Sequence, residues 1–157
     1  MMLKLVSSGL VVFAGVVCAP ATVSPVQYNQ GPEVRQDVRA SAVRGFFEKT
    51  GCPASQYSQA FLDAADGYRL DWRLLPSISF VESTGGKAAP HNNIFGWDNG
   101  RSRFSSPSAA IWGVAYQLGQ SVLYRDKSLN QLLALYNPDP AYAVKVKSVM
   151  RQIATVQ

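Results

Sequence analysis

The chain has 157 residues, of which 47% are apolar and 16% are charged. This is the composition of one ordinary domain that buries a core, and it excludes a disordered chain. The formal charge of +5 at pH 7 favours anionic partners, although so modest a charge is equally compatible with no specific partner. Nucleic acid is disfavoured, because no run of lysine and arginine alternates with aromatic residues.

The first 21 residues predict a secretory signal peptide. Lys4 supplies one positive charge, residues 5–19 form an apolar run, and small residues suit cleavage after Ala19 or Ala21. The alternative is an uncleaved membrane anchor, but the run is short of the roughly 20 residues that cross a bilayer. We therefore expect a secreted or periplasmic, cell-wall-associated protein with no stable membrane insertion after cleavage.

The two cysteines and the single histidine do not suggest a metal site. Cys18 lies inside the predicted signal peptide, so Cys52 is the only cysteine expected in the mature chain, and its expected role is packing. His91 lies in a polar loop without a second histidine or cysteine to complete a zinc site. We expect neither a metal nor a cofactor.

Residues 22–32 are rich in Pro, Gln, Ser and Gly and predict a flexible spacer, and residues 33–157 predict one helical domain. Its first helix is expected from Glu33 to Gly51. The second is expected from an N-cap at Ser55 to a stop near Gly67. The expected inward residues of these two helices are Val34, Val38, Ala42 and Phe46, then Tyr57, Phe61, Ala64 and Tyr68.

The third helix carries Glu82, the most informative residue of the chain. The helix must begin close to Trp72, because Pro76 cannot lie deep inside a helix, and Gly85 and Gly86 end it. Glu82 therefore falls in the last helical turn, next to a loop.

Glu82 shares a helix face with Leu75, Ile78 and Ser79, which precede it by seven, four and three positions. A carboxylate held against so apolar a face is costly to ionise, so we expect a raised pKa. A raised pKa suits a general acid that protonates a leaving oxygen at neutral pH, as in glycosidases. The alternative is a carboxylate paired with Lys87 or with an arginine.

The loop after this helix predicts a minimal β-hairpin. Asn99-Gly100 is a hairpin turn signal, and residues 94–95 and 101–104 could pair on either side of it. Beyond it, helices are expected to begin at Pro107, after Ser128 and at Pro140. Their expected inward residues are Ile111, Val114, Ala115, Leu118 and Val122; Leu129, Leu132, Leu133 and Tyr136; and Tyr142, Val146, Val149, Met150 and Ile153. The predicted fold class is mainly α.

Four segments carry a resemblance to a known family. They are YRLDWRLLP at 68–76, VESTGG at 81–86, NNIFG at 92–96 and YNPDPAYAVKV at 136–146. In this order they resemble motifs of the endo-β-N-acetylglucosaminidase family of bacterial cell-wall hydrolases, and the resemblance extends over residues 54–153. It implies a lysozyme-like helical domain with the hairpin beside the catalytic helix.

The resemblance also implies a function: hydrolysis of the β-1,4 glycan strand of peptidoglycan by a monomer, with Glu82 as proton donor and Tyr136 across the cleft near the cleaved bond. The alternative for Tyr136 is packing on the core. The residues expected to bind substrate are Asn92, Asn93, Phe95, Gly96, Trp97, Asp98 and Tyr142. For the two asparagines the alternative is side chains that bond their own backbone. Trp97, Phe104 and Trp112 are candidates for stacking on sugar faces, and Trp112 could equally belong to the core.

The chain departs from the family pattern in its second carboxylate, for which only Asp98 is available after the asparagine motif. Many glycosidases use two carboxylates. With one, the 2-acetamido group of the substrate could act as nucleophile, an anhydro product could form, or activity could be lost. A lytic transglycosylase or muramidase is the alternative enzyme, although the Gly-Leu-Met-Gln stretch typical of transglycosylases is missing. A non-catalytic peptidoglycan-binding module is the alternative of another class.

Overall fold

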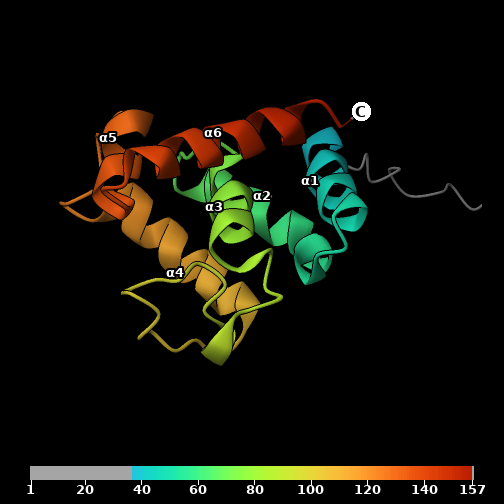
Figure 1. The fold of residues 1–157 in the computed structure, drawn as a ribbon, viewed down its shortest axis with the longest axis horizontal. Helices are drawn as coiled ribbons and strands as arrows, with labels where there is room; N and C mark the ends of the chain where they lie inside the picture. The colour runs from blue at the N-terminus through green and yellow to red at the C-terminus, as the bar shows by residue number, and fades with distance from the viewer. Residues whose placement is uncertain (1–36, 157) are drawn as a thin grey trace, which may run out of the picture. The chain divides into compact units, whose positions relative to one another are not determined.

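The computed structural model of the chain describes residues 37–156, which are mainly helical, as predicted (Figure 1). The predicted signal peptide, the spacer and Val34 lie outside the described residues. Within them, no helix is both long enough and apolar enough to cross a bilayer. The elements are α1 (Val38–Lys49), η1 (Pro53–Tyr57), α2 (Ser58–Gly67), α3 (Leu74–Ser83), η2 (Pro90–Asn92), α4 (Pro107–Gln120), α5 (Leu129–Tyr136) and α6 (Pro140–Ala154).

The starts of the last three helices are confirmed. Ser106 Oγ accepts the backbone N–H of Ala109 before α4, and Asp139 accepts that of Ala141 before α6. Ser128 forms a capping box with Gln131 before α5. These side chains satisfy backbone N–H groups that have no partner within the helix, so local sequence suffices to place each start.

The first two helices begin later than predicted. Asp37 caps α1, and Val38 is 80% exposed, so the predicted inward position of Val38 is wrong. In a helix of 3.6 residues per turn, residues four positions apart are rotated by about 40° from one another, so a long series at this spacing leaves the buried face. Ala42 and Phe46 are buried, as predicted, and the inward face of α1 also includes Val43 and Phe47. Ser55 lies inside η1 and not at an N-cap, because a 3₁₀ turn beginning at Pro53 precedes α2.

The central helix is α3, whose residues 74–79 are all buried. It packs against α2 and α6, and Figure 1 shows it in the middle of the helical domain with α6 crossing beside it. Thr84 ends it in the left-handed conformation, followed by Gly85 and Gly86 with positive φ. Glu82 therefore lies in the last turn, as predicted.

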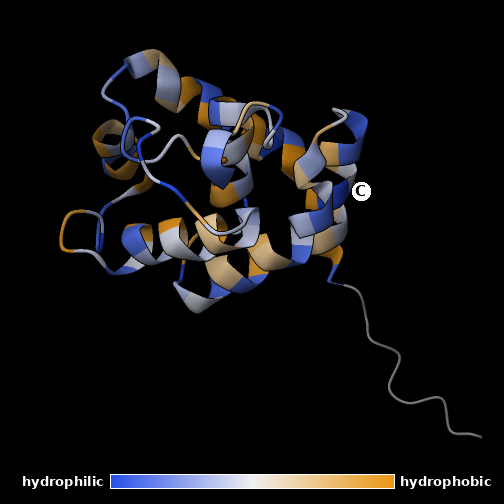
Figure 2. Cartoon of the chain, turned by 90° about the horizontal axis from the view of Figure 1, so that it is seen from below, coloured by the Kyte–Doolittle hydropathy of each residue, from blue (hydrophilic) through white to orange (hydrophobic). Residues whose placement is uncertain are grey.

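One core holds residues 37–156 together. Figure 2 shows hydrophobic and hydrophilic residues alternating along the helical ribbons, as expected of amphipathic helices. At the centre, the ring of Phe61 lies 5.8 Å from that of Phe47 and 6.4 Å from that of Phe95. The core therefore joins α1 and α2 to the loop that follows α3. Cys52 is also buried there, which agrees with a packing role.

The predicted β-hairpin is wrong, because residues 37–156 contain no strand. The turn itself forms: Arg101 N donates to Asp98 O at 3.0 Å, and Asn99 and Gly100 both have positive φ, as a type I′ turn requires. Asp98 also has a positive φ of 54°. That value lies outside the extended region, so pairing cannot continue beyond the turn.

Candidate active site

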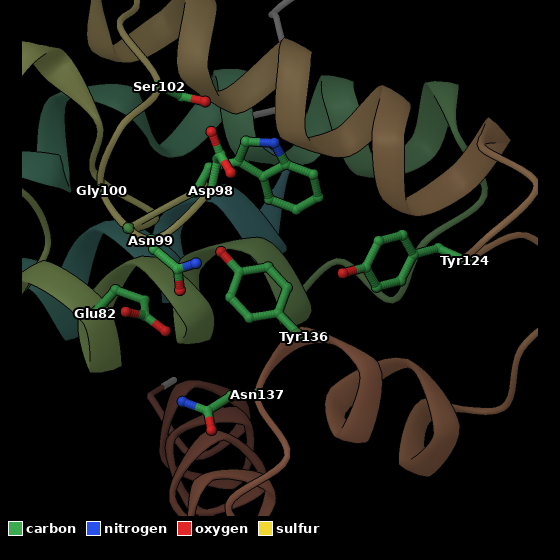
Figure 3. A pocket seen from close by; sticks show the side chains of 10 residues that line it. Glu82, Asp98, Asn99, Gly100, Ser102, Tyr124, Tyr136 and Asn137 are labelled. Atoms are coloured by element: carbon green, nitrogen blue, oxygen red, sulfur yellow. The ribbon is translucent and has the colours of Figure 1, made fainter.

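A hollow of about 590 Å³ opens beside the C-terminal end of α3. We call it the Glu82 hollow; its volume lies in the range of small-molecule sites, about 300–1,000 Å³. Its lining residues come from α3, the loop after it, the segment before α5 and the end of α5 (Figure 3). They are Glu82, Gly96, Trp97, Asp98, Asn99, Gly100, Ser102, Tyr124, Tyr136 and Asn137.

Glu82 is exposed to solvent through the open side of the hollow, while Leu75, Ile78 and Ser79 on the same helix are fully buried. Partial burial nevertheless raises the pKa of its carboxyl above the usual value. No described cation makes an ion pair with Glu82, and Lys87 donates instead to the carbonyl of Thr50 at 3.2 Å. The predicted apolar wall is largely a polar and aromatic one, formed by the loop and by tyrosines.

Gly96 lies directly against this carboxyl. Its φ is +59°, and a Cβ atom built there would lie 2.7 Å from Glu82 Oε2. A side chain at this position would displace the carboxyl or distort the loop. Gly96 therefore forms the wall beside Glu82, as predicted.

Tyr136 provides the opposite wall, and Figure 3 shows its ring next to the Glu82 carboxyl. Its hydroxyl donates to the carbonyl of Phe95 at 2.6 Å. Burial, with the charge of Glu82 as a smaller contribution, raises the pKa of Tyr136 well above its usual value. The hydroxyl is therefore protonated and already bonded, and it is the ring that faces the hollow.

Tyr142 lies behind this wall rather than in the lining. Its ring stacks on that of Tyr136 at 5.8 Å with an interplanar angle of 6°, and it is only 5% exposed. Its hydroxyl is close enough to Glu82 to lower the pKa of the carboxyl, yet the buried oxygen makes no hydrogen bond of ordinary geometry. Tyr142 is thus a buried neighbour of Glu82 with an unused donor.

Three residues of the predicted substrate set hold the loop and do not face the hollow. Asn93 is buried and bonds both backbone polar groups of Trp97, each at 2.9 Å. Asn92 donates to the carbonyl of Phe104 at 2.9 Å. Phe95 is fully buried in the core and contributes only its carbonyl, to Tyr136. For both asparagines, the alternative of bonding to the loop's own backbone describes what the structure shows.

Asp98 lies in the hollow but is committed to Arg101, whose Nη2 is 2.5 Å from Asp98 Oδ1. In Figure 3 it lies at the Ser102 end of the hollow, away from Glu82. Among the described residues, Glu82 and Asp98 are the two carboxylates in this lining. Glu82 alone combines a raised pKa with freedom from a cation.

The three candidate stacking residues separate in space. The Trp97 ring lies in the hollow, 5.6 Å from that of Tyr136 and 6.0 Å from that of Tyr124. Phe104 packs against the core. Trp112 is 41% exposed and packs on Tyr68, outside the lining of the hollow.

Five lining residues were not predicted as site residues from the sequence: Asn99, Gly100, Ser102, Tyr124 and Asn137. Asn137 directly follows Tyr136 in the motif at 136–146, so its place in the site could have been predicted from that motif. Tyr124 carries no sequence signal, because it comes from a segment of turns after α4 and reaches the hollow only through packing on Trp97.

Among residues 37–156, no three histidine, cysteine or acidic side chains come together as metal ligands. His91 bonds Arg103 through Nδ1 at 3.0 Å.

Comparison of the chain with protein-family models, with curated proteins and with solved structures found no match in any of the three.

Proposed function

We propose that this chain is a secreted peptidoglycan hydrolase with a lysozyme-like fold that cleaves the β-1,4 glycan strand as an endo-β-N-acetylglucosaminidase. The observation that carries the proposal is Glu82: a carboxyl with a raised pKa and no ion pair, at the wall of an open hollow lined by aromatic rings. Rings of this kind suit the apolar faces of sugars. The four motifs of the sequence support the same class.

The proposed step uses one protein carboxyl. Glu82 in its protonated form donates a proton to the glycosidic oxygen as the bond from that oxygen to C1 breaks. Because Asp98 is paired with Arg101, we assign the attack on C1 to the carbonyl oxygen of the substrate's own 2-acetamido group. Water then attacks C1 of the resulting oxazolinium ion and opens its ring, and the Glu82 carboxylate recovers its proton from that water.

Tyr136 and Trp97 hold the sugar in this scheme. The Tyr136 hydroxyl is engaged by the Phe95 carbonyl, so its ring is assigned the task of positioning the sugar ring and its acetamido group over Glu82. Trp97, in contact with Tyr136, extends this surface. Gly96 leaves the space that the carboxyl needs.

Glu82→Gln tests the proposal, because glutamine keeps the shape of the side chain and removes the transferable proton. We expect clearing of purified cell wall to fall by about 10²–10⁴-fold, the usual contribution of a general acid. Binding of the variant to the wall in a pull-down should remain. Glu48→Gln, on the exposed side of α1, is the matched control and should clear the wall like the unsubstituted protein.

Equal clearing by Glu82→Gln and the unsubstituted protein would end the proposal. Binding of the wall with no clearing by either protein would support the non-catalytic module. The masses of the products separate the enzyme alternatives: a new reducing end on N-acetylglucosamine supports the glucosaminidase, one on N-acetylmuramic acid a muramidase, and an anhydro product a transglycosylase.

A further inference from the structure

A second hollow of about 650 Å³ lies next to the Glu82 hollow. It is formed by the end of α2, the end of α4 and the segment that leads to α5. Tyr124 lines both hollows. The two hollows thus share one wall residue, whose side chain is buried.

The second hollow is rich in positive charge, and we call it the basic hollow. Arg69, Arg125 and Lys127 line it, against a single carboxylate, Asp126. All four residues are exposed to solvent. The net charge of these side chains favours an anionic ligand.

The cations of the basic hollow form no ion pairs, unlike three arginines elsewhere in the described residues. Elsewhere in residues 37–156, Arg39, Arg73 and Arg101 each pair with an aspartate at 2.5–2.8 Å. Neither Arg69, Arg125 nor Lys127 makes an ion pair with a described carboxylate, and their side chains donate no hydrogen bond to another described residue. Their donors are free for a ligand.

We infer that the basic hollow binds the carboxylates of the peptide stems that peptidoglycan carries, while the glycan itself occupies the Glu82 hollow. This inference rests on the proposed function. Peptide stems branch from alternate sugars of the strand and end in free carboxylates, so a glycan in the first hollow brings anions to its neighbour. Arginine suits this ligand, because its planar guanidinium binds a carboxylate through two parallel hydrogen bonds.

The consequence is selectivity for glycan that bears stems. The triple variant Arg69→Gln/Arg125→Gln/Lys127→Gln, made in the Glu82→Gln background, should bind soluble stem-bearing strands at least roughly tenfold more weakly than Glu82→Gln alone. Its binding of the same strands freed of their stems by an amidase should be unchanged. In the active protein the triple change should raise KM on stem-bearing strands and leave kcat and the cleavage of stripped strands as they were.

The matched control removes three other exposed cations, Arg44, Lys49 and Arg151, by the same change to glutamine. These residues do not line the basic hollow, and the control has the same net charge as the triple variant. Circular dichroism verifies the fold of both. Equal weakening in the two triples would show an effect of net charge alone and would overturn the inference.

The source of the anion is separated by a third probe, stripped strands that still carry the wall's phosphate polymer. If the triple variant binds these phosphate-bearing strands more weakly but binds stem-bearing strands normally, the basic hollow binds phosphate, and the assignment to stems is overturned. The failure of the proposed function can be told apart from the failure of this inference. Stem-dependent binding without any cleavage would refute the hydrolase and keep the inference. Equal cleavage of stem-bearing and stripped strands, by both the active protein and its triple variant, would keep the hydrolase and refute the inference.

Discussion

The chemistry of Glu82 is set by three neighbours that sequence distance does not reveal. Gly96 leaves room for the carboxyl, and Tyr136 closes the other side of the hollow. Tyr142 lies behind Tyr136, and its hydroxyl has no hydrogen-bond partner among the described residues. Partial burial raises the pKa of the carboxyl, and the nearby Tyr142 hydroxyl acts against it by stabilising the charged form. Protonation of Glu82 is thus a balance between burial and one donor.

Tyr142→Phe removes that donor, so the pKa of Glu82 should rise. A general acid must be protonated, and the rate therefore falls as pH rises through its pKa. We expect the alkaline limb of the kcat/KM profile to move to higher pH in the variant. Tyr116→Phe, at a residue 50% exposed, is the control; an unmoved limb or a shift to lower pH would contradict the assignment.

The same pKa shift affects stability with a defined sign. The folded-state pKa of Glu82 lies above the unfolded value, so the group contributes stability below the unfolded pKa. That contribution is lost as pH rises through the folded pKa. The ionised form of Glu82 is therefore a cost to the fold at any pH above the folded pKa.

Among the elements, the loop after α3 decides the shape of the Glu82 hollow. It has no ladder of backbone hydrogen bonds. Away from the turn, its two sides are joined by the backbone bond from Phe104 N to His91 O and by the side chains of Asn92 and Arg103. Asn93 replaces the ladder locally, since its buried amide accepts from Trp97 N and donates to Trp97 O. One side chain thereby holds the segment that carries Gly96 and Trp97.

Asn93→Ala should lower the free energy of unfolding by about 1–3 kcal/mol, because both backbone groups of Trp97 lose their partner. Wall clearing should fall as well, since the wall beside Glu82 is no longer held. Asn93→Asp, which keeps an acceptor for Trp97 N and loses the donor, should lie between the two proteins. Urea unfolding and the clearing assay measure both effects. An alanine variant as stable as the unsubstituted protein would show that Asn93 does not hold the loop.

At the scale of the whole described domain, an aromatic core connects the distant helices to the site. Phe47 on α1 and Phe61 on α2 stack, and Phe61 meets Phe95 edge to face. The carbonyl of Phe95 in turn accepts from Tyr136. Packing in the centre of the domain is therefore continuous with the walls of the Glu82 hollow.

Phe61→Ala should cost about 3–5 kcal/mol, because the fully buried ring leaves a cavity that the surrounding helices cannot fill. This is a large part of the about 5–15 kcal/mol that stabilises a typical domain. Thermal and urea unfolding measure the loss. Val122 was predicted to face inward, but it lies beyond the end of α4 and is 80% exposed. Val122→Ala should therefore change stability by less than about 0.5 kcal/mol. A small loss for Phe61→Ala would mean that the core tolerates collapse around that site.

Much of the helical pattern could be predicted, because its causes are local. Ser106, Ser128 and Asp139 cap helices through bonds to backbone groups two or three residues away. The inward residues of α6 follow from helical periodicity, and Gly85 and Gly86 mark the end of α3. Where two local signals competed, as at Pro53 and Ser55, the predicted boundary was wrong.

The site could be predicted only in part. The position of Glu82 at the end of a helix follows from neighbouring residues in the chain, above all Gly85 and Gly86. The direction of some loop side chains does not: Phe95 turns inward onto Phe61, and the bond between Tyr136 and Phe95 spans 41 residues. Which residues face a ligand depends on such long-range contacts.

The chain alone thus specifies the helices and the candidate acid, since capping, turn chemistry and periodicity act within a few residues. Folding in three dimensions decides the rest. It places Tyr124 between two hollows, gathers Arg69, Arg125 and Lys127 around one of them, and gives Glu82 its raised pKa. Burial and charge fields are sums over whatever lies nearby in space, and they exist only after segments distant in the chain have packed together.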